Sequence, residues 1–114
     1  MASITSLKKN FEFKRLYTRG ESAVSPFLAV YAKKNRYGFN RLGITVGTKV
    51  GKAVTRNLVR RRIREAYRLN QDRLCQGCDI VIVARVRAAS ASYRQIEASM
   101  LKLLGKLDLL RDVE

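Results

Sequence analysis

The chain has 114 residues and a formal net charge of +15, from 24 lysines and arginines against nine aspartates and glutamates. An apolar fraction of 46% excludes an intrinsically disordered chain, and the length fits a single domain over residues 1–114. A folded domain this basic repels itself, so we expect a polyanionic partner, with nucleic acid before an anionic membrane.

The first predicted helix covers residues 11–19. Asn10 is a favoured N-cap and Gly20 a favoured stop signal, while Phe13, Leu16 and Tyr17 share one face by their i,i+3 and i,i+4 spacing. Aromatic side chains on one face of a short helix usually belong to a core, but here three basic residues surround them, namely Lys14, Arg15 and Arg19. We therefore interpret this face as a mixed surface on which a nucleic-acid base can stack.

Two strands are predicted next, over residues 27–34 and 41–47, after a turn-like segment at residues 20–26. Their alternating pattern has the period of two that is typical of half-buried strands, and the short connection between them predicts an antiparallel hairpin. One face of the hairpin is aliphatic. The other carries polar and aromatic side chains and two glycines that leave room for a close approach, namely Tyr31, Lys33, Arg41, Gly43, Thr45 and Gly47. We expect this second face to form one wall of a groove.

The next predicted helix, over residues 51–70, organises the rest of the chain. At about 100° per residue it divides into two sides. The apolar side comprises Leu58, Val59, Ile63, Ala66, Tyr67 and Leu69, and the basic side comprises Asn57, Arg60, Arg61, Arg64 and Arg68. Arginines at i,i+4 repel one another and only Glu65 lies at the edge of this stripe, so we expect phosphates of a polyanion to neutralise it. Arg56 and Arg62 project toward the apolar side.

The remaining residues predict one more strand and a last helix. Residues 79–85 form a continuous aliphatic run, typical of a strand covered on both faces, and Arg85 and Arg87 close it with two cations. Ser92 and Gln95 then form a capping box at the start of an amphipathic helix. The order α-β-β-α-β-α predicts an α+β domain in which helices pack on a small sheet.

Several of these segments resemble the bacterial ribonuclease P protein subunit. The arginine-rich signature of that family is matched by residues 52–57, 60–61 and 64–68. Further matches are residues 7–10 with Phe13 and Tyr17, residues 41–43 and residues 79–81. The matching segments follow the order of the family and cover almost the whole chain.

The resemblance implies a fold like the second domain of ribosomal protein S5, with a left-handed β-α-β crossover. It also implies that the chain binds a catalytic RNA subunit and precursor tRNA and assists endonucleolytic removal of the 5′ leader, with magnesium held mainly by the RNA and no cofactor held by the protein alone. The residues to which it assigns catalytic-RNA binding are Arg56, Asn57, Arg60, Arg61, Arg64 and Arg68, and we predict the same role for Lys52. It assigns leader binding, in a groove between the first helix and the sheet, to Phe13, Tyr17 and Tyr31. From the residue pattern we predict the same role for Lys33, Thr45 and Arg85.

The residue inventory argues against an active site within the chain itself. Phosphodiester hydrolysis needs histidines for proton transfer or clustered carboxylates for metal ions, whereas this chain has no histidine and its acids are mostly scattered singly. We therefore predict no catalytic residues. Cys75 and Cys78 form one C-x-x-C pair, too few ligands for zinc and outside a thioredoxin-like context, so we interpret them as incidental thiols and predict no metal site.

Two alternatives concern the partner, and one expectation concerns the location. A ribosomal or chaperone-like RNA-binding protein without enzymatic context has the same composition, and an aromatic groove is the feature that argues against it. A DNA-binding regulator would place a short helical hairpin before its recognition helix, but a strand precedes the arginine helix here, so we expect no DNA partner. With no membrane-length apolar run and no signal peptide, we expect a cytoplasmic protein and no membrane partner.

Overall fold

The aliphatic run predicted as a buried strand forms the centre of the sheet. The structure is a computed structural model that describes residues 4–111, and in it this run is strand β4 (Cys78–Ala84). Ile80, Val81 and Ile82 are completely buried, because helices cover both faces of the sheet at this strand. The prediction of a strand covered on both faces is therefore confirmed.

Four strands make up the sheet, in the order β1-β2-β4-β3. Strand β2 (Leu28–Lys34) pairs antiparallel with β1 (Glu21–Val24) on one side and with β4 on the other, and β3 (Arg41–Val46) pairs parallel with β4. The predicted hairpin of residues 27–34 with residues 41–47 is therefore wrong. A strand that is apolar on both faces is most stable in the interior of the sheet, and β4 takes that place between the two segments.

The sheet also contains a strand that the sequence pattern did not predict. Residues 21–24, interpreted as part of a turn, form β1 and make the true hairpin with β2. Ser25 closes this hairpin, because its hydroxyl oxygen accepts a hydrogen bond from the backbone N–H of Leu28 at 3.0 Å and its backbone N–H donates to the Leu28 carbonyl at 2.8 Å. The observed order is α-β-β-β-α-β-α, and the predicted α+β class is confirmed.

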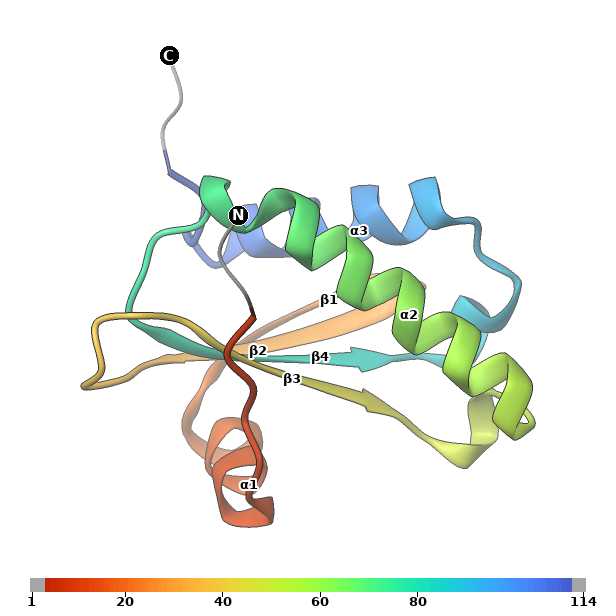
Figure 1. Ribbon diagram of the computed structural model, residues 1–114, viewed down its shortest axis with the longest axis horizontal. Coiled ribbons are helices and arrows are strands. Elements are labelled where there is room, and N and C mark those ends of the chain that lie inside the picture. The colour runs from red at the N-terminus through yellow and green to blue at the C-terminus, as the bar shows by residue number, and fades with distance from the viewer. Residues whose placement is uncertain (1–3, 112–114) are drawn as a thin grey trace.

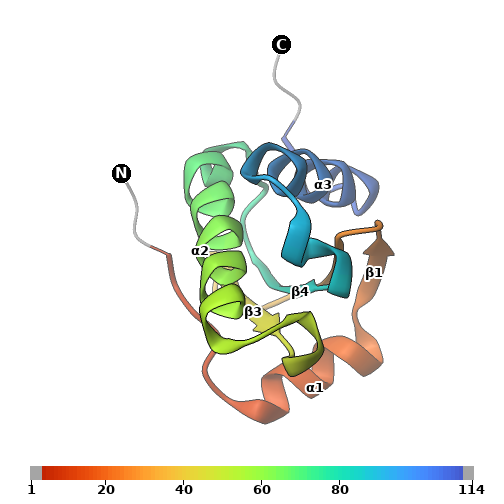
Figure 2. The same ribbon diagram turned by 90° about the vertical axis from the view of Figure 1, so that its right-hand side faces the viewer.

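The three helices lie in layers on the two faces of the sheet. Helices α2 (Ala53–Asn70) and α3 (Tyr93–Lys106) cover one face, and α1 (Asn10–Arg19) crosses the other, as Figure 1 shows. Short 3-10 turns lie between β3 and α2 (Thr48–Val50), between α2 and β4 (Gln71–Arg73) and between β4 and α3 (Val86–Ser90). Seen from the face that α2 covers, with both parallel strands pointing upward, β4 lies to the left of β3 (Figures 1 and 2). The β3-α2-β4 crossover is thus left-handed, as the resemblance implied and against the usual preference.

Local signals fixed most helix boundaries to within a residue. The predicted capping box of α3 is present, with the Gln95 N–H donating to the Ser92 hydroxyl at 3.1 Å and the Ser92 N–H donating to the Gln95 side chain at 2.9 Å. Helix α1 begins at Asn10 itself, with Lys9 as the N-cap residue, so Asn10 is not the cap. The Glu12 carboxylate accepts a bond from the Lys9 N–H at 3.2 Å, as the third helical residue of a capping box does.

The apolar side of α2 packs into the main core much as predicted. Val59, Ile63, Ala66 and Tyr67 are buried between the helix and the sheet. Two residues of the predicted apolar side are not buried, since Leu58 is only half-buried and 52% of the surface of Leu69 is exposed. A smaller cluster on the opposite face of the sheet, built around Leu7, Leu16 and Val81, anchors α1 to the sheet.

Candidate RNA interface

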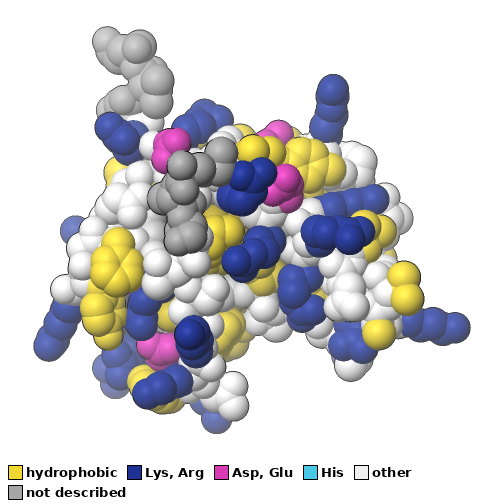
Figure 3. All heavy atoms as spheres, in the orientation of Figure 1, with side chains coloured by type: hydrophobic (Ala, Val, Ile, Leu, Met, Phe, Trp, Pro, Cys, Tyr) yellow, Lys and Arg dark blue, Asp and Glu magenta, His cyan; other side chains and the backbone are white. Residues whose placement is uncertain are grey.

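The basic side of α2 is a continuous exposed surface. Lys52, Asn57, Arg60, Arg61 and Arg64 are all exposed, as the predicted division of the helix requires. Figure 3 shows lysine and arginine side chains gathered over this face of the molecule. Among the described residues, no ion pair joins Arg60, Arg61 or Arg64 to a carboxylate. These side chains are therefore available to meet phosphates.

One arginine of the stripe is engaged within the chain. Arg68 donates from its Nε to the Glu65 carboxylate at 2.6 Å and makes a second bond to it at 3.0 Å, so this end of the stripe is partly neutralised. The bonds from Arg68 lower the pKa of Glu65, and those same bonds raise the pKa of Arg68. Both side chains are exposed, so water screens the pair and its contribution to folding is small.

The two arginines that the helical projection placed toward the apolar side tie α2 to its surroundings. Arg56 donates from its Nε to the Gly51 carbonyl at 3.2 Å, and Arg62 donates to the Ala91 carbonyl at 2.7 Å. Arg62 thus joins α2 to the segment that precedes α3. Of the seven residues predicted to bind catalytic RNA, Arg56 and Arg68 are therefore engaged by this chain, while the other five lie on the open surface.

The predicted groove lies where α1 crosses the sheet. The strand register places Tyr31 and Gly43 on either side of Val81, so this row of the sheet lies under the helix. Phe13 packs directly on Gly43, since a Cβ atom at that position would lie 2.6 Å from the Cε2 and Cζ atoms of its ring. The glycine lets the aromatic ring of α1 reach the floor of the sheet.

Three of the predicted leader-binding residues form a connected cluster beside α1. The rings of Tyr17 and Tyr31 meet edge to face with their centroids 5.0 Å apart, and the Tyr17 hydroxyl lies 3.1 Å from the Thr45 hydroxyl. Tyr17 is 40% exposed, so part of its ring remains open to a ligand. A half-exposed aromatic ring next to hydroxyl groups can stack a base and bond to it.

Two predicted leader-binding residues lie apart from this cluster. Lys33 pairs in register with Asp79, one row further along the sheet and across α1 from Thr45. Arg85 follows the end of β4, where its guanidinium donates to the Ser25 carbonyl at 2.8 Å in the β1–β2 turn. The structure therefore brings together Phe13, Tyr17, Tyr31 and Thr45 but neither Lys33 nor Arg85.

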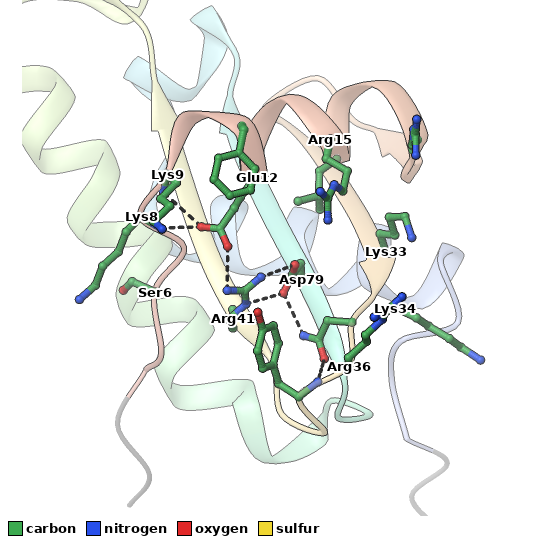
Figure 4. A pocket seen from close by; sticks show the side chains of 15 residues that line it. Ser6, Lys8, Lys9, Glu12, Arg15, Lys33, Lys34, Arg36, Arg41 and Asp79 are labelled. Carbon is green, nitrogen blue, oxygen red and sulfur yellow. Dashed lines mark hydrogen bonds and ion pairs between the residues drawn. The ribbon is translucent and has the colours of Figure 1, made fainter.

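A cavity of about 930 Å³ lies on the side of α1 that Lys33 occupies, and sequence reasoning missed it. Figure 4 shows its lining, contributed by the segment before α1, by α1 itself and by the end of β2 with the turn that follows. Eight lysines and arginines line it, against Glu12 and Asp79 as the only acids of the lining. The one signal in the sequence was a pair of basic doublets, at residues 8–9 and 33–34.

Arg41 lies at the floor of this cavity and holds both acids. It contacts Asp79 through two bonds of 2.8 and 2.7 Å and Glu12 at 2.8 Å, and its guanidinium lies 4.4 Å from the centre of the Tyr37 ring. Burial raises the pKa of each carboxyl, but the hydrogen bonds that it accepts outweigh burial, so the pKa of Glu12 and that of Asp79 are both lowered. The hydrogen bonds that Arg41 donates to Asp79 raise the pKa of the arginine. All three groups are thus charged at neutral pH.

Two further features bear on what this surface can do. No group of three or more histidine, cysteine, aspartate or glutamate side chains within residues 4–111 is arranged to hold a metal ion. In the same part of the chain, no helix is both long and apolar enough to cross a membrane.

Comparisons with known proteins agree on one family. Residues 1–108 match the protein-family model for Ribonuclease P. The ribonuclease P protein component of Alkaliphilus oremlandii is 44% identical over 110 residues, with 96% of each chain covered, and that of Clostridium botulinum is 46% identical over 101 residues, with 88% of this chain and 91% of the other covered.

Solved structures of the same kind have the same fold. The RNase P protein of Staphylococcus aureus matches with a TM-score of 0.87 at 32% identity, over 96% of this chain and 100% of the other. The RNase P protein of Thermotoga maritima matches with a TM-score of 0.81 at 30% identity, over 89% of this chain and 96% of the other.

Proposed function

The chain belongs to the ribonuclease P protein family, and on this premise we propose which of its surfaces meets which RNA. It is the protein subunit of ribonuclease P, the ribonucleoprotein that removes the 5′ leader of precursor tRNA. The ribosomal or chaperone-like alternative has no support in the comparisons, since the relatives are ribonuclease P protein components. What remains to be assigned are the contacts with RNA.

We propose that the exposed side of α2 binds the catalytic RNA. The observation that carries this proposal is a surface of like charges formed by Arg60, Arg61 and Arg64, which have no carboxylate partner within residues 4–111. Each guanidinium can bond a phosphate through two parallel N–H groups. From Asn57 to Arg68 the surface is about 17 Å long at 1.5 Å per residue, long enough to meet several phosphates of one strand.

The 5′ leader lies, in this proposal, in the groove beside α1. The support is the cluster of Tyr17, Tyr31 and Thr45, where an exposed ring and two hydroxyls face the same space. A single-stranded leader presents unpaired bases, and any of the four bases can stack on an aromatic ring.

Magnesium in this scheme is bound by the catalytic RNA, and the chain supplies binding and orientation. The proposed location is the cytoplasm, where bacterial precursor tRNA is processed.

The assignment of α2 can be tested with a double variant, Arg60→Ala with Arg64→Ala. We expect weaker binding of the catalytic RNA and a salt dependence that is shallower by about one unit of slope for each phosphate that is no longer bound. The free energy of unfolding should stay nearly the same, because exposed arginines contribute little to it. Arg94→Ala with Lys102→Ala is the matched control, since it removes the same charge from exposed positions of α3. Equal weakening in both double variants would show a general effect of charge and would contradict the assignment.

The leader assignment needs a different pair of variants. Tyr17→Ala removes the stacking ring and should weaken binding of precursor tRNA by about fivefold to a hundredfold, the range for one base stacked on an aromatic ring, while binding of mature tRNA stays unchanged. Tyr17→Phe keeps the ring and removes only the bond to Thr45, so it should retain most of the affinity. If Tyr17→Ala weakens both tRNAs equally, the leader does not lie at this ring.

A further inference from the structure

The cavity on the Lys33 side of α1 contains more cations than its carboxylates can neutralise. Its eight basic side chains and two carboxylates give a formal net charge of +6, and Arg41 alone satisfies both carboxylates. None of the other seven cations forms an ion pair among the described residues. So many cations around one space repel one another until an anion is bound.

The cavity also has two exposed aromatic walls. Phe11 on α1 is 54% exposed and Tyr37 in the β2–β3 turn is 56% exposed. A cation lies against each ring, with the guanidinium of Arg15 5.9 Å from the centre of Phe11 and that of Arg41 4.4 Å from the centre of Tyr37. Rings of this kind accept a base by stacking, and the cations of the cavity other than Arg41 then meet its phosphates.

The size and charge of the cavity favour one class of ligand. A volume of about 930 Å³ suits a ligand of nucleotide size, within the range of about 300 to 1,000 Å³ for small-molecule sites. An internal nucleotide of an RNA strand brings only one negative charge for each phosphodiester. A 5′-triphosphate concentrates several charges on a single nucleotide, and it therefore matches a dense cluster of seven cations better.

We propose that this cavity binds a nucleotide carrying a 5′-triphosphate. The triphosphate lies among the basic doublets and Arg36, and the base stacks on Phe11 or Tyr37. Two sources supply this chemistry, namely the first nucleotide of an unprocessed transcript and a free nucleoside triphosphate. The site stands on the cavity itself, while the transcript as its source rests on the proposed leader groove on the other side of α1.

The test compares two short single-stranded RNA oligonucleotides that differ only in a 5′-triphosphate or a 5′-hydroxyl, each labelled at the 3′ end. Binding to the full chain is measured by fluorescence anisotropy at fixed salt. We expect the triphosphate form to bind at least about tenfold more tightly, the effect of one additional charge-assisted hydrogen bond. The preference should vanish in Lys34→Ala with Arg36→Ala, two exposed positions of the cavity, and should persist in Arg94→Ala with Lys102→Ala.

Competition with GTP identifies the source. If GTP displaces the triphosphate oligonucleotide when the two are at equal concentration, the ligand is a free nucleotide. If displacement needs a large excess of GTP, the ligand is the 5′ end of a transcript. Equal binding of the two oligonucleotides overturns the proposal, and so does a preference that survives in the cavity variant while circular dichroism shows it folded. If only the proposed leader groove is wrong, the result is different. Tyr17→Ala would then not change the affinity for the 5′-hydroxyl oligonucleotide, while the preference for the 5′-triphosphate oligonucleotide would remain.

Discussion

The contact between Gly43 and Phe13 predicts a specific cost for adding one methyl group. In Gly43→Ala the new Cβ atom would lie 2.6 Å from two atoms of the Phe13 ring and 3.4 Å from a methyl of Leu7. The ring belongs to the packed cluster of Leu7, Leu16 and Val81, so it has little freedom to move aside. Overpacking of this kind costs about 1–3 kcal/mol of the free energy of unfolding.

The control for this prediction is another glycine that follows the same strand. A Cβ atom at Gly47 would meet nothing within 4 Å, and its backbone has φ −74° and ψ 165°, which any residue adopts. Gly47→Ala should therefore be neutral or stabilise the protein by up to about 1 kcal/mol, since alanine restricts the unfolded chain. Chemical denaturation followed by circular dichroism measures both free energies.

A second substitution tests the cause of the destabilisation. Phe13→Leu removes the ring atoms that clash, so Gly43→Ala should cost less in its presence, with a coupling of about 0.5–3 kcal/mol in a double-mutant cycle. If Gly43→Ala is as stable as Gly47→Ala, or if its cost is the same with leucine at position 13, the ring does not rest on the strand as described.

Three other outcomes are expected. Asp79→Ala leaves the half-buried Arg41 with Glu12 as its one remaining carboxylate, and it should lower the free energy of unfolding by about 2–3 kcal/mol, below the range for a fully buried pair. Asp72→Ala, at an exposed position, should be neutral in the same denaturation assay. The pKa values of Glu12 and Asp79 are lowered in the fold, so their contribution to stability is complete above the ordinary values of 4.5 and 3.8 and is lost as pH falls through the folded-state values. Urea midpoints measured at decreasing pH should show this loss of stability. The loss should be smaller in Asp79→Ala, which has only one of the two carboxylates. Burial raises the pKa of Cys78, so iodoacetamide should modify the exposed Cys75 first, as peptide mass spectrometry can show.

Patterns confined to one segment predicted structure well. The spacing of Val59 and Ile63 fixed the buried side of α2, and Ser92 with Gln95 fixed the start of α3, because these signals depend on neighbours within a turn of helix. Leu69 failed because it lies at the edge of the buried side. At about 100° per residue it projects about 100° away from Asn70, which is buried like Tyr67 at the same end of α2.

The pairing of strands depended on information that no single segment contains. Residues 27–34 and 41–47 have the pattern and the short connection of a hairpin, but the more apolar β4 pairs with both of them. The candidate site divided in the same way. The cluster was predictable from the resemblance for Tyr17 and Tyr31 and from the strand alternation for Thr45, whereas the separation of Lys33 from it depends on where α1 crosses the sheet.

The position of β4 in the chain also has a consequence for biosynthesis. Arg41 finds its partner Asp79 38 residues later, so β3 has no neighbouring strand when it leaves the ribosome and bonds only to residues 5–7, through Leu42. The nascent chain must keep one edge of β2 and one edge of β3 unpaired until the last strand emerges, a period in which such edges are prone to associate with other chains. A chain stopped at Asn70 should therefore be digested rapidly by protease, since the sheet is completed only by the strand that is made last.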